Sequence, residues 1–231
     1  MIITPSTPNV EQDFDTLFTN CLADTFNTEA FYDTDSNALA FHREANTDFQ
    51  ILINALLYDY RSLWNKQQID SSEQFSLNLQ VLEYAKRTIA RENRTEHDAE
   101  IIRQIELVQD DMRNIPIKTI LTIIPDHQNL TAFAERYLLH TDDNSRVMCC
   151  LTEPATEITG SNNCTELKLK DNTFSDQNRL YTATDQEKIG RYSTTTIWYQ
   201  LGNNNDHLRT GLIHRAQTTD THPKPRALIH S

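Results

Sequence analysis

Residues 46–66, NTDFQILINALLYDYRSLWNK, carry the clearest conformational signal in the chain. Large apolar side chains recur there at the three- and four-residue spacing that aligns them in one stripe of an α-helix. The stripe consists of Phe49, Leu52, Ile53, Leu56, Leu57, Tyr60, Leu63 and Trp64. Thr47 and Gln50 have the spacing of a capping box at the start of the helix. We expect this helix to lie at the centre of a helical bundle.

The composition predicts a folded, acidic protein. Hydrophobic residues make up 38% of the 231 residues, which suffices for one domain with a sizeable core or for two small ones. The formal net charge of -12 argues against non-specific binding to nucleic acid, because such binding depends on lysine and arginine. The four cysteines have no CxxC spacing and are interpreted as reduced thiols.

Neither a signal peptide nor a transmembrane segment is predicted. The first residues lack a basic region followed by an apolar one. The most apolar run, residues 115–124, is about half as long as the roughly 20 residues that cross a bilayer. We therefore expect a protein that is cytoplasmic where it is synthesised, with export by a route independent of a signal peptide as the alternative.

The first part of the chain is free of glycine and has mainly helical periodicity. Beside residues 46–66, the pattern predicts helices at 9–26, 71–93, 95–115 and 126–138. Residues 117–124 fit either a short helix or a buried strand because they are rich in isoleucine; a helix is favoured. We expect a flexible N-terminus at 1–8 and a helical bundle at 9–140.

Beyond residue 146 the periodicity changes to that of strands. Strands are expected at 147–151, 165–170, 179–183, 195–201 and 211–216. The last two flank a turn-forming segment, GNNND, which predicts an antiparallel hairpin. The sequence thus predicts an α+β fold, with an N-terminal bundle of five or six helices, a small antiparallel β-sheet in the strand-rich region 146–217 and a flexible C-terminal tail at 218–231.

One candidate metal site involves the doublet His97-Asp98. Together with His42 upstream and Asp142 or Asp143 downstream, it resembles the ligand set of HD-domain metal phosphohydrolases. That resemblance implies a divalent ion that activates water for phosphate ester hydrolysis. In that family the doublet usually follows apolar residues, and here it does not.

A second candidate is the tripeptide Asn20-Cys21-Leu22, which resembles the sequence around the nucleophile of ovarian-tumour-type cysteine proteases. The resemblance implies a thiol activated by a histidine, for which His207 or His214 is available. Cys21 also belongs to the apolar stripe of the helix expected at 9–26, where a buried thiol acts as a small hydrophobic group. Packing in the core is the preferred interpretation.

Other reactive side chains receive structural interpretations. Cys149 and Cys150 are expected on opposite faces of one strand. The spacing of His207, His214, His222 and His230 matches no structural zinc motif, so these histidines are interpreted as incidental.

A group of basic residues marks the end of the helix expected at 71–93. It consists of Lys86, Arg87, Arg91 and Arg94. Such residues stabilise the negative end of the helix dipole, and they also form a candidate binding face for an acidic protein or a lipid headgroup.

No nucleotide-binding, zinc-protease or nucleophile-elbow motif occurs in the sequence. The sequence therefore favours a non-catalytic protein-protein interaction or adaptor module with a protein partner, such as a secreted bacterial or viral host-interaction factor. No cofactor, metal or catalytic residue is assigned. The alternative is a hydrolase, either a metal-dependent phosphohydrolase using His42, His97 and Asp98 or a cysteine protease-like enzyme using Cys21 with His207 or His214.

Overall fold

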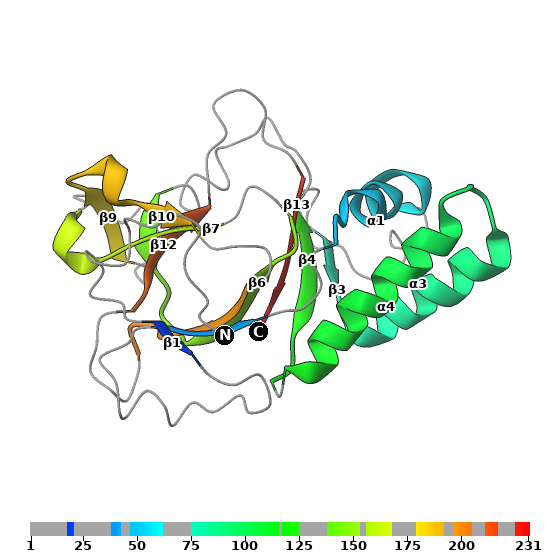
Figure 1. The fold of residues 1–231 in the computed structure, drawn as a ribbon, viewed down its shortest axis with the longest axis horizontal. Coiled ribbons are helices and arrows are strands. Elements are labelled where there is room, and N and C mark those ends of the chain that lie inside the picture. The colour runs from blue at the N-terminus through cyan, green and yellow to red at the C-terminus, as the bar shows by residue number, and fades with distance from the viewer. Residues whose placement is uncertain are drawn as a thin grey trace.

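The computed structural model shows a protein built around two β-sheets with helices on one side (Figure 1). The residues that it describes are 18–20, 38–42, 47–61, 75–115, 117–124, 138–152, 156–167, 179–191, 196–204, 211–216 and 225–231.

The larger sheet, sheet A, has seven strands. In spatial order they are β1 (Phe18–Asn20), β2 (Ala38–His42), β11 (Thr196–Gln200), β6 (Arg146–Cys150), β13 (Arg226–His230), β4 (Ile120–Ile124) and β3 (Phe75–Leu77). Neighbouring strands of sheet A are antiparallel except for the parallel pair β1 and β2.

The smaller sheet, sheet B, has six antiparallel strands. In spatial order they are β10 (Gly190–Arg191), β7 (Thr156–Thr159), β12 (Ile213–Ala216), β5 (Leu139–Thr141), β9 (Arg179–Ala183) and β8 (Cys164–Glu166). A short 3-10 turn at Ser161–Asn163 connects β7 to β8, and another at Gln186–Lys188 connects β9 to β10.

Eight of these strands form a jelly roll. From β4 to β7 the chain changes sheet at every strand, and after β10 it returns to sheet A as β11, crosses to sheet B as β12 and returns as β13. The result is the order β11-β6-β13-β4 in one sheet and β10-β7-β12-β5 in the other. Crossing between two antiparallel sheets in this way is the topology of jelly rolls, which protect most strand edges by pairing. Figure 1 shows the order of the layers: sheet B, then sheet A, then the helices.

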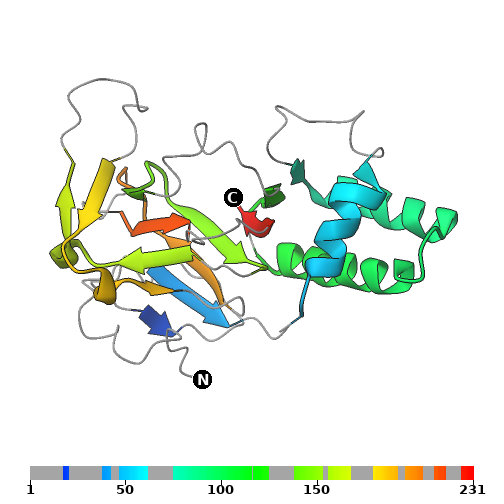
Figure 2. The same cartoon turned by 90° about the horizontal axis from the view of Figure 1, so that it is seen from above.

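Three helical segments cover the outer face of sheet A, as the view from above also shows (Figure 2). They are α1 (Gln50–Asn54), which continues as the π-helical segment η2 (Ala55–Asp59), α3 (Leu79–Glu92) and α4 (Asp98–Asn114). Asn78 caps α3 because its side chain accepts a hydrogen bond from the Val81 N–H at 2.9 Å. None of the helices in the described ranges is long and apolar enough to cross a membrane.

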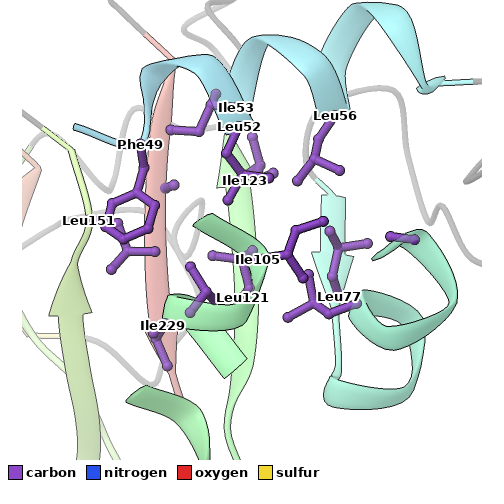
Figure 3. Close-up of a cluster of buried hydrophobic side chains, with 14 of the residues drawn as sticks. Phe49, Leu52, Ile53, Leu56, Leu77, Ile105, Leu121, Ile123, Leu151 and Ile229 are labelled. Carbon is purple, nitrogen blue, oxygen red and sulfur yellow. The ribbon is translucent and has the colours of Figure 1, made fainter. Parts of the chain in front are cut away.

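The apolar stripe of residues 46–66 is helical and buried, as predicted, over its described part. Phe49, Leu52, Ile53 and Leu56 are almost completely buried in a core that sheet A shares with helices α3 and α4 (Figure 3). Their partners come from strands β3, β4 and β13 and from the end of β6, namely Leu77, Leu121, Ile123, Ile229 and Leu151. The expected capping box does not form, since the Asp48 carboxylate, not Thr47, accepts the Gln50 N–H at 2.9 Å.

The predicted bundle of five or six helices over 9–140 is wrong. In the described part of that region, strands β1, β2, β3 and β4 accompany the helices. Residues 120–124 form β4 because this isoleucine-rich run pairs with β3 on one side and β13 on the other. The stabilisation from pairing β4 with β3 and β13 in a buried sheet exceeds the helical preference that the spacing of these residues suggests. The helix expected at 126–138 lies outside the described residues except for Leu138.

Two predictions about the C-terminal third are also wrong. Strands β11 and β12 do not form a hairpin: β11 pairs in sheet A and β12 pairs in sheet B. The turn-rich segment between them connects the two sheets instead. The expected flexible tail contains β13, a central strand of sheet A whose Ala227 and Ile229 are buried. The strands predicted at 147–151, 179–183, 195–201 and 211–216 are present as β6, β9, β11 and β12.

Candidate metal centre

Strands β5 and β12 bring two histidines and one aspartate together. His140 and His214 are directly opposed in this antiparallel pair, and their ring centroids are 4.5 Å apart. Asp142 follows His140 by two residues, a spacing that directs both side chains to the same side of an extended chain. One potential ligand atom from each of the three residues lies within 4.8 Å of the others, and all three residues are buried.

Backbone contacts orient both imidazole rings. His140 Nδ1 lies 2.7 Å from the Leu138 carbonyl oxygen, and His214 Nδ1 lies 3.0 Å from the Leu212 carbonyl oxygen. A carbonyl only accepts hydrogen bonds, so the proton of each neutral ring is placed on Nδ1. The Nε2 lone pair of each ring is then directed towards Asp142, as a metal ligand requires.

Asp142 is ionised at neutral pH. Burial raises the pKa of this carboxyl group, but the nearby His214 and Arg146 outweigh that effect and lower the pKa to about 2. Arg146 Nε donates to Asp142 Oδ2 at 2.6 Å, and its Nη2 pairs with Oδ1. Gln200 Nε2 also donates to Oδ2 at 2.6 Å. The triad therefore supplies one negative charge for a cation.

His214 is neutral at neutral pH. Burial lowers the pKa of this imidazole to about 4, against the opposing effect of the Asp142 carboxylate. His214 Nε2 is 3.3 Å from Asp142 Oδ2, while His140 Nε2 is 4.0 Å from Asp142 Oδ1. Neutral imidazole nitrogen and ionised carboxylate are the forms that bind metal ions. The donor set thus fits a divalent first-row transition metal.

Both histidines of the triad line a cavity of about 210 Å³ between the two sheets. Its lining combines both histidines with polar residues and with apolar side chains of sheet A: Ser76, Ile120, Thr122, Ile124, Arg146, Met148, Thr156, Arg226, Leu228 and His230. Along β13 the side chains alternate, since Arg226, Leu228 and His230 face the cavity while Ala227 and Ile229 face the helices. A molecule bound there would contact both histidines of the triad and the cavity face of β13.

Arg226 is the second guanidinium of the cavity beside Arg146. Its Nη2 lies 3.4 Å from Thr156 Oγ1 and 3.9 Å from Cys150 Sγ. Among the described residues, no carboxylate pairs with it within salt-bridge distance. A guanidinium held beside a hydroxyl inside a cavity is suited to bind the carboxylate of a ligand.

The doublet His97-Asp98, the candidate metal site of the sequence analysis, does not lie in a metal-ligand cluster among the described residues. His97 and Asp98 lie at the start of α4, far from sheet B, and the His97 side chain is exposed. Asp98 is buried and accepts hydrogen bonds at 2.7 Å from both the Tyr60 and the Thr95 hydroxyl groups. His42 lies in β2. Within the described ranges, His140, Asp142 and His214 are the only cluster with metal-ligand geometry.

The cysteine protease interpretation finds no support. Cys21, His207 and His222 lie outside the described residues. His214, one of the two proposed bases, instead belongs to the triad. Cys149 and Cys150 point to opposite faces of β6, as predicted, because Cys149 packs in the core beneath the helices and Cys150 in the cluster between the sheets.

The candidate basic face lies at the end of α3 and beyond it. Lys86 and Arg87 both pair with Glu83, at 3.1 and 2.9 Å. Arg94 pairs with Glu92 and lies over the Tyr60 ring, with 5.5 Å between guanidinium carbon and ring centroid. Binding by Lys86, Arg87, Arg91 and Arg94 remains a prediction.

The sequence did not single out His140, which is the last residue of the predicted helical bundle at 9–140, and it placed Asp142 and His214 in other candidate sites. One feature of the sequence could have identified the triad. A His-x-Asp triplet on a strand directs both side chains to one face, and a later histidine in a second predicted strand can complete the set. The predicted non-catalytic adaptor with an effector-like role is wrong, because the structure brings a buried His-Asp-His cluster with metal-ligand geometry together beside a cavity.

Comparison with protein family models and with curated protein sequences finds no match. Solved structures with a related arrangement include a dioxygenase for auxin oxidation from Arabidopsis thaliana bound to 2-oxoglutarate, with 9% identity and a TM-score of 0.43 over 93% of this chain and 91% of that one. Another is C-terminally truncated Neurospora crassa T7H, with 11% identity and a TM-score of 0.37 over 84% and 81% of the two chains. At such distances the function is argued from the site itself.

Proposed function

We propose that this protein is a mononuclear non-haem iron(II) oxygenase that uses a small carboxylate co-substrate. The observation that carries the proposal is the convergence of His140, Asp142 and His214 in a buried site, where one potential ligand atom of each lies within 4.8 Å of the others. Two histidines and one carboxylate with open positions are the ligand set of non-haem iron(II) oxygenases. When bound, iron would supply the activation of dioxygen.

The residues of the chain have separate tasks in this proposal. His140 and His214 hold the ion through nitrogen atoms whose orientation the Leu138 and Leu212 carbonyl groups set. Asp142 contributes the single negative charge, and Gln200 holds its Oδ2 in place. Gln200 is itself held in place, because Trp198 Nε1 donates a hydrogen bond to Gln200 Oε1 at 3.0 Å.

Arg226 accounts for the carboxylate co-substrate. Its guanidinium lines the same cavity as both histidines and has the Thr156 hydroxyl beside it. A ligand with one carboxylate at Arg226 and a second oxygen group near the triad would span the cavity. A 2-oxo dicarboxylic acid has this chemistry. Apolar neighbours such as Met148 and Leu228 exclude water from the reacting groups.

The experiment is anaerobic reconstitution with Fe²⁺, followed by removal of loose metal and elemental analysis. Wild type is expected to retain about one iron per chain, and His140→Ala, Asp142→Ala and His214→Ala much less. His97→Ala is the matched control, because this histidine is exposed on α4 and should leave the iron content unchanged. Consumption of dioxygen with 2-oxoglutarate should follow the iron content. Equal iron retention by wild type and the folded His214→Ala variant would refute the proposal.

A further inference from the structure

Arg146 occupies an unexpected place for a residue beside a metal ligand. It is the first residue of β6, it lines the cavity, and its guanidinium forms a two-point contact with the Asp142 carboxylate. Gln200 donates to Oδ2 of the same carboxylate. Both carboxylate oxygens therefore already have partners in the protein, and an arriving metal ion competes with Arg146 for at least one of them.

The charges of the cavity disfavour a metal ion on its own. Among the described lining and ligand residues, Asp142 contributes one negative charge, while Arg146 and Arg226 contribute two positive ones. A divalent cation adds to this positive excess inside a poorly solvated site, where like charges repel more strongly than in water. A small dianion in the same cavity would cancel most of the excess and give both guanidinium groups a new partner.

We propose that Arg146 couples metal binding to the binding of an anionic co-substrate, so that each ligand strengthens the binding of the other. The inference rests on the proposed function, because it takes His140, Asp142 and His214 as the metal ligands. Arg146 is a positioning residue in this scheme. It holds Asp142 before the metal arrives and opposes the metal until an anion is present. By linkage, the metal raises the affinity for the anion by the same factor as the anion raises the affinity for the metal.

A second interpretation of Arg146 makes a different prediction. If Arg146 only orients Asp142, its loss would weaken metal binding, and the effect of the anion would stay the same. If Arg146 is the source of the coupling, its loss would strengthen binding of the metal alone and reduce the effect of the anion. The sign of the change in metal affinity therefore separates the two interpretations.

The test is calorimetric titration of the metal-free protein with Mn²⁺ under anaerobic conditions, with and without saturating 2-oxoglutarate, corrected for the metal that the free acid binds. For wild type we expect the Mn²⁺ dissociation constant to fall about tenfold or more when 2-oxoglutarate is present, within the usual range of coupling between two ligands. Arg146→Gln should bind Mn²⁺ alone several-fold more tightly than wild type and show a coupling of less than about threefold.

Two further variants serve as controls. Arg146→Lys keeps the positive charge and should keep most of the coupling. Arg226→Gln should weaken 2-oxoglutarate binding. Because Arg226 contacts Thr156 and Cys150 rather than Asp142, its loss should strengthen binding of Mn²⁺ alone less than the loss of Arg146 does. Thermal unfolding checks that each variant is folded.

The outcomes separate the two proposals. Weaker Mn²⁺ binding by folded Arg146→Gln, with unchanged coupling, would overturn the role of Arg146 and leave the proposed metal site intact. Mn²⁺ binding that does not depend on His214 would overturn the proposed function itself.

Discussion

The buried imidazole of His214 makes the metal-free protein sensitive to mild acid. Its pKa is lowered from 6.5 to about 4 in the folded state, with burial as the main cause. Between those two values the unfolded chain binds a proton that the folded chain does not, so the free energy of unfolding decreases as the pH falls. Each pH unit in this window corresponds to about 1.4 kcal/mol, which gives a loss of about 3 kcal/mol between pH 7 and pH 4.

The Asp142 carboxylate affects the stability of the fold in a lower pH range than His214 does. Its pKa is lowered from 3.8 to about 2, where burial opposes the shift and the charges of His214 and Arg146 prevail. The stability from this ionised carboxylate is therefore present above pH 3.8 and is lost only below that value. A loss of stability between pH 6.5 and pH 4 can thus be assigned to His214 rather than to Asp142.

Urea unfolding of the metal-free protein, in the presence of a chelator, at several pH values from 7 to 4 measures the effect. His214→Gln removes the titrating group and should lose much less stability over this range than wild type. His97→Gln is the matched control because that side chain is 60% exposed; it should follow wild type. If His214→Gln and wild type lose equal stability as the pH falls, the protonation argument is wrong.

Two further predictions concern packing. Leu56→Asp places a charge at a core side chain that is 1% exposed. In urea unfolding it should reduce the free energy of unfolding by several kcal/mol. The control Tyr58→Asp changes a side chain that is 66% exposed and should alter this free energy little. An equal effect of the two would contradict the assigned burial. Gly202→Ala would place a Cβ atom 2.3 Å from the Asn144 carbonyl carbon, and it should lower the free energy of unfolding by about 1–3 kcal/mol. It should also weaken Mn²⁺ binding, because the backbone of Gly202 packs against the turn that follows Asp142. An unchanged melting temperature would show that the turn has room.

Periodicity predicted α1, α3 and α4 well, because the buried side chains of each helix form one stripe whose spacing is visible in the sequence. Leu52, Ile53 and Leu56 are buried in the order that the 3.6-residue period requires. Periodicity could not show that the partner was a sheet. An apolar stripe is compatible with any apolar surface, and the choice between helix and strand partners depends on residues far away in the sequence.

The missed strands have a common cause. Residues 120–124 repeat isoleucine at spacings that suit a helix, while the pairing with β13 that makes them a strand involves residues 226–230. Those residues in turn follow a polar, proline-containing stretch and were interpreted as a tail. Neither segment identifies itself as a strand without the other, so both were assigned incorrectly.

The site was only partly readable from the sequence. The triplet His140-Thr141-Asp142 is visible as a motif, and the strand that carries His214 was predicted correctly. Their proximity depends on the pairing of β5 with β12. The predicted hairpin would instead pair β12 with β11 and place His214 away from His140 and Asp142. An error in strand pairing thus concealed the chemistry.

The alternation along β13 has a consequence for how the protein can change during evolution or in engineering. Ala227 and Ile229 pack against the helices, while Leu228 and His230 line the cavity. There Leu228 also packs on the apolar cluster between the sheets, and His230 Nε2 lies 2.9 Å from Thr122 Oγ1. Substitutions at these two positions change the cavity wall and remove only these local contacts, while Ala227 and Ile229 keep the strand in the core. A library restricted to positions 228 and 230 would vary the shape and polarity of the cavity while the residues of the triad stay constant.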